Sequence, residues 1–212
     1  MDETDIEFIE NYTTGLYTEK HGYLLMAIAR RRFNEGISNS EEVVHRRIIT
    51  KGDDIERQVG DLRALMSQHD LHFRLYLTVN SRDLVSSLFD FQQDISSMIE
   101  SLYNGDEDEL QRVQRLGSEW KSAAHAPENS NESMFLFDLD DVSQAEMKEF
   151  KSRLRKHTSI HVTRETPNGY HIITAPFNYN DLSETATEAY DDLDRDGMVY
   201  VATVDNREDS DV

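Results

Sequence analysis

The stretch MFLFDLDD, residues 134–141, decides how this chain folds and where its chemistry lies. Side chains alternate along a strand, so one face carries three apolar groups, Phe135, Phe137 and Leu139. The other face carries Leu136, Asp138 and Asp140, which places the two carboxylates about 7 Å apart at the end of an apolar strand. Two such carboxylates suit one or two divalent metal ions. The alternative is a strand that runs into a polar turn, with Asp141 as a helix cap.

The segments after this strand alternate between helix and strand patterns. A helix is expected over 143–156 and a strand over 159–165. Pro167-Asn168-Gly169 then forms a tight turn into a strand over 170–174, which together predict a hairpin. A short helix over 181–190, a strand or strand pair over 193–204 and a frayed acidic tail complete the chain.

The segments before it begin with helical patterns. Apolar residues recur at spacings of three and four over residues 5–70, which predicts helices. The basic cluster at residues 30–32 of this segment is assigned no chemistry. Residues 73–80 alternate and predict a strand with Phe73, Leu75, Leu77 and Val79 on its core face. Helices follow over 81–103 and toward Trp120, and 126–132 is a polar loop. The expected fold class is α/β (α+β), with a helical segment at 1–70, a mixed-sheet core at 71–204 and an acidic tail at 205–212.

The composition restricts where such a protein works. The 212 residues include 42 acidic and 22 basic side chains, a net charge of −20, and no cysteine, which excludes disulfides, thiol nucleophiles and cysteine-bound zinc. Only 6 of the 22 basic residues are lysine, and an acid excess with scarce lysine is typical of proteins from salt-loving organisms. In such organisms the charge reflects the solvent and does not exclude nucleic acid as a partner. No membrane span or signal peptide is expected, so a cytoplasmic location and no membrane partner are predicted.

Two further segments carry groups that suit the same chemistry. His171 follows the tight turn on a strand, and Asp192 and Asp194 share a face if their segment is extended. Taken singly, a histidine in the position of His171 most often has a structural or surface role. The acids near residue 192, taken alone, have the composition of an acidic turn.

The order of the three segments resembles the catalytic core of the archaeo-eukaryotic primase superfamily, which includes primase-polymerases. Phe137-Asp138-Leu139-Asp140 matches its Asp-x-Asp strand, residues 166–171 resemble its turn and strand histidine, and Asp192 or Asp194 stands for its third acid. The resemblance covers roughly residues 71–204. It implies Mg²⁺ or Mn²⁺ held by Asp138, Asp140 and Asp192 or Asp194, and a contact between His171 and the triphosphate of a nucleotide. It also implies polar and cationic nucleotide contacts, for which the candidates are Arg74, Asn80, Arg82, Lys121 and Arg164.

The leading hypothesis is therefore a primase-like nucleotidyltransferase, of viral or plasmid origin in a halophile, that joins nucleoside triphosphates on a single-stranded nucleic-acid template. If the protein is viral, it would act in the host cytoplasm. A metal-dependent nuclease or RNA-end-processing enzyme is the first alternative, because the same side chains serve phosphodiester hydrolysis. The second is a non-catalytic replication accessory protein that binds other replication proteins through its N-terminal helices.

Overall fold

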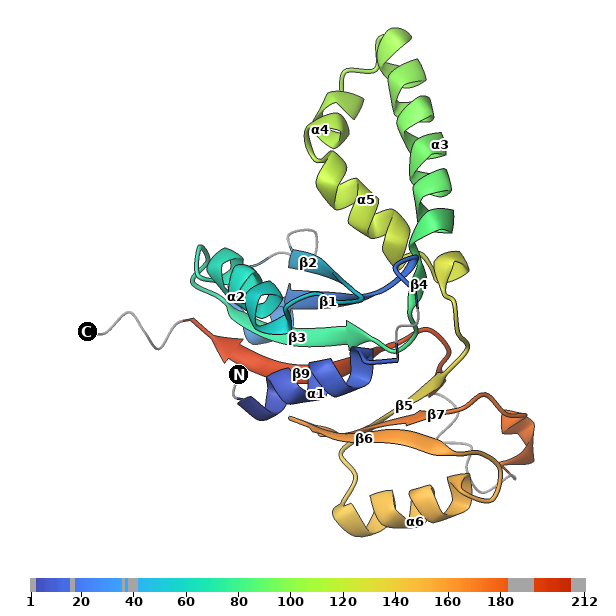
Figure 1. Cartoon of the computed structure of the whole chain (residues 1–212). Coiled ribbons are helices and arrows are strands. Elements are labelled where there is room, and N and C mark those ends of the chain that lie inside the picture. The colour runs from blue at the N-terminus through green and yellow to red at the C-terminus, as the bar shows by residue number, and fades with distance from the viewer. Residues whose placement is uncertain (1–2, 16–17, 36, 38–41, 183–192, 207–212) are drawn as a thin grey trace.

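The computed structural model describes residues 3–15, 18–35, 37, 42–182 and 193–206. It contains two antiparallel sheets, helices that cover them, and a helical hairpin that projects from the body (Figure 1). The fold is of the α+β class. No helix in these residue ranges is long and apolar enough to cross a membrane.

The first sheet, sheet A, has the strand order β2-β1-β3-β9, with the short β4 paired to β1. Its bounds are β1 His21–Ala29, β2 Val43–Thr50, β3 His72–Thr78, β4 Arg82–Asp83 and β9 Met198–Asp205. Helices α1 (Glu3–Thr13) and α2 (Ile55–Met66) contribute apolar side chains such as Ile9 and Leu62 to the main core on one face of this sheet. The other face carries Leu24, Met26, Ile28 and Tyr76.

The second sheet, sheet B, has the order β6-β7-β5-β8. It consists of β5 (Phe135–Asp140), β6 (Ile160–Thr166), β7 (Gly169–Thr174) and β8 (Leu193–Asp194). Helix α6 (Gln144–Leu154) begins at a capping box of Ser143 and Glu146 and covers the apolar face of β5. The opposite face of sheet B packs through Leu136 and Ile173 on the core of sheet A.

The projecting hairpin consists of α3 (Leu84–Tyr103), α4 (Glu109–Gln114) and α5 (Leu116–His125). The Asp83 side chain accepts hydrogen bonds from the first backbone N–H groups of α3, which fixes where that helix begins. Phe91 of α3 packs on Trp120 of α5, with ring centroids 5.9 Å apart. Among the described residues, the connections contain the short 3-10 helices η1 (Arg31–Phe33), η2 (Pro127–Asn129) and η3 (Tyr179–Asp181).

The structure confirms the strand predicted at 73–80 and the hairpin at 159–174. It also confirms two strands within 193–204, β8 in sheet B and β9 in sheet A. The prediction of a helical segment over 1–70 is wrong for its middle part, because β1 and β2 are strands of sheet A, paired along their whole length. These residues therefore belong to the same sheet as β3 and β9, and only α1 and α2 are helical. Most of the helix predicted over 181–190 and most of the predicted acidic tail lie outside the described residues.

Candidate functional site

A cleft of about 430 Å³ lies where sheet A meets sheet B. Sheet B contributes Asp138, Asp140, His171 and Asp194, together with the turn at 166–168. Sheet A and the segment after β1 contribute six side chains, Arg30, Arg32, Arg74, Tyr76, Met198 and Tyr200. The cleft thus has an acidic wall and a cationic, aromatic wall.

The acidic wall is organised by His171. Asp138 and His171 are directly opposed in the register of β5 and β7, so their side chains lie on one face of sheet B. The backbone N–H of Tyr200 donates to His171 Nδ1 (3.0 Å), which places the proton of the neutral ring on Nε2. That nitrogen lies 3.2 Å from Asp138 Oδ1. The hydrogen bond from His171 lowers the pKa of Asp138 against the opposing effect of burial, and the charges of Arg32 and Arg30 lower it further. Asp138 is therefore held as an oriented carboxylate.

Asp194 and Asp140 extend the same wall. Asp194 is opposed to Leu136 in the register of β5 and β8, which puts it on the face that carries Asp138. Its Oδ1 accepts the backbone N–H of Asp196 (2.9 Å). Asp140 is exposed and pairs with Gly169, where a Cβ atom would overlap the carbonyl oxygen of Leu139. Only glycine lets β7 approach β5 this closely beside the two aspartates.

The cationic wall consists of arginines held by aromatic rings. Arg32 and Arg74 lie over the Phe33 ring, at 4.6 and 3.9 Å from its centroid, and Arg30 lies 5.8 Å from the centroid of Tyr76. No carboxylate among the described residues lies within ion-pair distance of these three guanidinium groups. Arg74 is buried and its Nε has no hydrogen-bond partner in the described structure. These charges therefore remain available to an anion.

The acidic wall offers the hard oxygen ligands that Mg²⁺ and Mn²⁺ prefer. Within the described ranges no group of three His, Asp or Glu side chains is arranged to hold a metal. Asp138 and Asp140 alone still fit the usual mode of Mg²⁺, which takes one or two carboxylates and completes its shell with substrate phosphates and water. Asp192, the other predicted metal ligand, lies outside the described residues.

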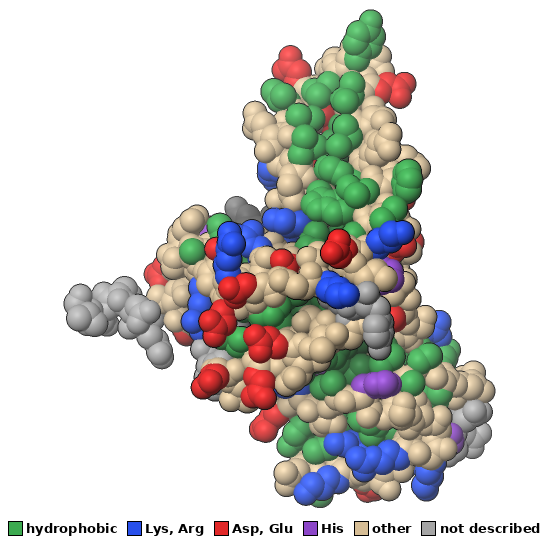
Figure 2. Space-filling view, in the orientation of Figure 1, with side chains coloured by type: hydrophobic (Ala, Val, Ile, Leu, Met, Phe, Trp, Pro, Cys, Tyr) green, Lys and Arg blue, Asp and Glu red, His purple; other side chains and the backbone are tan. Residues whose placement is uncertain are grey.

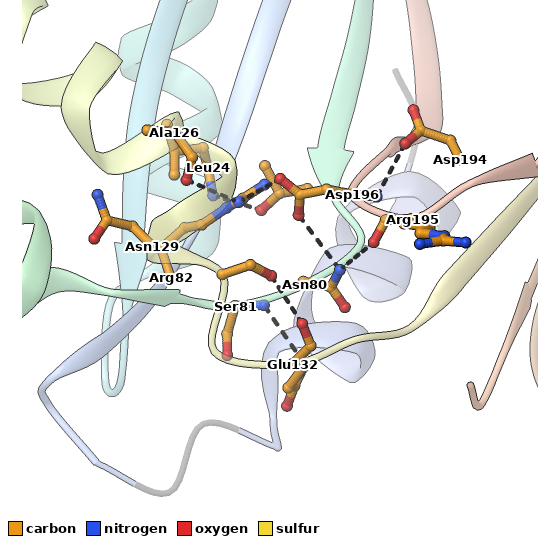
Figure 3. Close-up of polar contacts among 12 residues, drawn as sticks. Leu24, Asn80, Ser81, Arg82, Ala126, Asn129, Glu132, Asp194, Arg195 and Asp196 are labelled. Atoms are coloured by element: carbon orange, nitrogen blue, oxygen red, sulfur yellow. Dashed lines mark hydrogen bonds and ion pairs between the residues drawn. The ribbon is translucent and has the colours of Figure 1, made fainter. Parts of the chain in front are cut away.

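Arg82 and Asn80, two of the predicted nucleotide contacts, do not line the cleft. Figure 3 shows them beside Asp196 and Arg195. The Arg82 side chain is completely buried and donates to Asp196 Oδ2 (2.7 Å). Asn80 Oδ1 accepts the backbone N–H of Met134 (2.8 Å), and its Nδ2 donates to the carbonyl of Arg195 (3.1 Å). Asn80 thus connects Met134, just before β5, to the loop between β8 and β9, and Arg82 connects β4 to the same loop. The role of both side chains is therefore structural.

Lys121 and Arg164 also point elsewhere. Lys121 lies on α5 beside β2, where burial and the charges of Arg47 and Arg46 lower its pKa. Arg164 is opposed to His171 in the register, but its guanidinium donates to Asp5 and to the carbonyl of Val201. It ties β6 to α1 and β9. Of the predicted cations, only Arg74 reaches the cleft.

Arg30 and Arg32 are the site residues that the sequence analysis missed. The sequence does contain a signal for an anion-binding cluster, since three consecutive arginines follow an apolar run in a chain of net charge −20. In a segment predicted to be helical, the cluster was assigned no chemistry. The strand β1 instead delivers it to the cleft.

In comparisons with protein-family models, with curated proteins and with solved structures, no match to this chain was found.

Proposed function

We propose that this protein is a metal-dependent nucleotidyltransferase of the primase type, which joins nucleoside triphosphates on a single-stranded nucleic-acid template. One observation carries the proposal: two exposed carboxylates, Asp138 and Asp140, share one cleft with three arginines that have no ion-pair partner among the described residues. Triphosphate transfer needs both features, since cations must bind the phosphates and carboxylates must hold the metal beside them.

Each wall has its own task in this proposal. Asp138 and Asp140 would hold the divalent ion, with Asp194 beside them. Two divalent cations, when bound, supply charge neutralisation at the triphosphate and activation of the attacking hydroxyl. Arg30, Arg32 and Arg74 bind the triphosphate oxygens, as guanidinium groups do in bidentate contacts.

His171 acts as a positioning residue for Asp138. Its Nδ1 is engaged by a backbone N–H, and its remaining N–H is directed at the carboxylate. A phosphate contact would have to compete with that bond, so the arginines take over the triphosphate contact that the family resemblance gives to His171.

The test is incorporation of labelled nucleotides on a single-stranded template, with Mn²⁺ in molar KCl. Asp138→Asn/Asp140→Asn should abolish incorporation and weaken Mn²⁺ binding measured in the presence of a non-hydrolysable nucleotide. The matched control is Asp106→Asn/Asp108→Asn, which removes two carboxylates at the same spacing from the tip of the hairpin. Equal activity in the two double variants would refute the proposal.

The cationic wall has a separate test. Replacing Arg30 or Arg32 with Gln should raise KM for the nucleotide about ten- to a hundredfold, since a charged hydrogen bond contributes roughly 1.5–3 kcal/mol. Arg57→Gln, on an exposed position of α2, should leave KM unchanged. Cleavage of the template without incorporation would identify a nuclease. Metal binding with neither activity would identify an accessory protein.

A further inference from the structure

The projecting hairpin carries an exposed hydrophobic surface. Among the described residues, the large hydrophobic side chains that remain exposed all lie on α3 and α4: Val85 (40%), Leu88 (53%), Phe89 (62%), Ile99 (59%), Tyr103 (92%) and Leu110 (50%). Figure 2 shows hydrophobic side chains along the hairpin from its tip to its base. Single exposed apolar residues scattered over a surface need no explanation, but exposed apolar side chains gathered on one element mark an interaction site.

Five of these side chains form one stripe along α3, the apolar stripe: Val85, Leu88, Phe89, Ile99 and Tyr103. With Gln92 and Ser96 between its two ends, the stripe advances in steps of three or four residues, so it lies on one face of the helix. The opposite side of α3 already packs in the hairpin through Ser87, Phe91 and Met98. The helix is therefore apolar on a second face that nothing in the described chain covers.

Apart from Leu88, whose mirror position is Glu100, the stripe is symmetric about the middle of the helix. Val85 and Tyr103 lie equally far from Asp94 in opposite directions, and so do Phe89 and Ile99. The polar pair Gln92 and Ser96 is centred on the same residue. In an antiparallel pair of α3 helices, each apolar end would meet the apolar end of the other copy, and Gln92 would meet Ser96. Such a self-complementary surface is what a two-fold dimer requires.

The charges on α3 also favour a second copy. The helix has three acidic residues and no basic one. Asp90 accepts a hydrogen bond from Asn129 of η2, and Asp94 lies on the side away from the stripe. Only Glu100 borders the stripe. A surface that binds a basic partner helix would carry carboxylates along both borders of the apolar stripe. This stripe is uncharged, so two acidic chains can approach each other along it.

The area available matches a reversible dimer. Aromatic side chains bury about 150–250 Å² each, so Phe89 and Tyr103 at their observed exposure offer about 300 Å², and the aliphatic residues bring the stripe to roughly 500 Å² per copy. Two copies would bury on the order of 1,000 Å², the lower limit of specific interfaces.

We propose that two copies of this protein dimerise by antiparallel packing of their α3 helices through the apolar stripe. Sedimentation velocity over a range of protein concentrations should show reversible association from 24.6 kDa to twice that mass. Because each chain carries a charge of −20, raising KCl from 0.1 to 1 M should tighten the dimer several-fold. A protein that stays monomeric at 100 µM in both salts would overturn the proposal, and the stripe would then belong to a different partner.

A pair of matched variants tests the surface. Phe89→Glu/Ile99→Glu places two charges in the stripe and should weaken dimerisation at least tenfold. Ser86→Glu/Ser97→Glu adds the same two charges to exposed positions of α3 beside the stripe and should leave it within a factor of two. A dimer that survives the first variant unchanged, in protein with a wild-type circular dichroism spectrum, would show that another surface forms it.

The register is tested by cross-linking, since the chain contains no natural cysteine. In the antiparallel pair Val85 meets Tyr103 of the other copy. A mixture of Val85→Cys and Tyr103→Cys chains should therefore form a disulfide-linked dimer on oxidation. Val85→Cys alone should not, because its two thiols would lie at opposite ends of the helix pair. Cross-linking of Val85→Cys alone would indicate a parallel pair and overturn the antiparallel assignment.

Discussion

The buried pair of Arg82 and Asp196 gives a sharp test of what holds the two sheets together. Arg82 follows β3 at the edge of sheet A, and Asp196 lies in the loop between β8 and β9. Their side chains are 0% and 18% exposed, and Nη1 lies 2.7 Å from Oδ2 (Figure 3). Two donors of the guanidinium, Nε and Nη2, have no partner in the described structure. The Arg82 charge therefore depends on one carboxylate.

Removing that carboxylate should be much more harmful than removing the arginine. Asp196→Ala leaves a fully buried cation unpaired, which costs about 3–5 kcal/mol of unfolding free energy. In a chain of this size each kcal/mol shifts Tm by about 2–4 °C, so Tm should fall by roughly 6–20 °C. Arg82→Met leaves a carboxylate that water can still reach, and the loss should be about 1–3 kcal/mol. The double variant Arg82→Met/Asp196→Leu should recover most of the loss, because it leaves no buried charge.

Denaturant unfolding at fixed KCl, followed by circular dichroism, measures these values. The control is Glu119→Ala, which breaks an exposed ion pair with Arg112 and should change stability by at most about 1 kcal/mol. If Asp196→Ala lost no more than this control, or less than Arg82→Met, the buried-charge reasoning would be refuted.

Three other changes probe the cleft and its support. In His171→Phe, carboxyl NMR should show the lowered pKa of Asp138 return toward its ordinary value of 3.8. The wild-type hydrogen bond should accordingly add stability above about pH 4 that is lost as the pH falls through the lowered pKa, and this dependence should be missing in the variant. Gly169→Ala should destabilise the fold by more than 1 kcal/mol in denaturant unfolding, because its Cβ would overlap the Leu139 carbonyl; full stability would show that β7 can shift away. Phe137→Ala, at a position 1% exposed, should cost about 3–5 kcal/mol by the same measurement, and a loss below 1 kcal/mol would contradict its place in the core under α6.

The sequence predicted those strands that have one apolar and one polar face. In β3 and the residue that follows its end, the core side chains Phe73, Leu75, Leu77 and Val79 are all buried, while Arg74 on the other face reaches the cleft. In β5, the alternation separates the side chains under α6 from the aspartates in the cleft. A period of two residues has no helical equivalent, so these segments could be assigned from the sequence alone.

The sequence could not identify β1, and the reason is its burial. This strand lies between β2 and β3 with both faces covered, and eight of its nine residues are buried. Apolar residues therefore occupy consecutive positions without alternation, and such a run also fits the spacing of a helix. Only the pairing of its backbone with two neighbouring strands distinguishes the two structures.

The candidate site was likewise predicted only in part from the sequence. The family resemblance, which rests on the order of these segments, predicted Asp138, Asp140 and His171 in one site, and the structure places all three in the cleft. The tertiary structure alone decided that Arg30 and Arg32 face them, and that Arg82 is buried as a structural ion pair. A side chain's direction along one strand follows from local periodicity, whereas which cation meets which carboxylate depends on how two separate sheets pack.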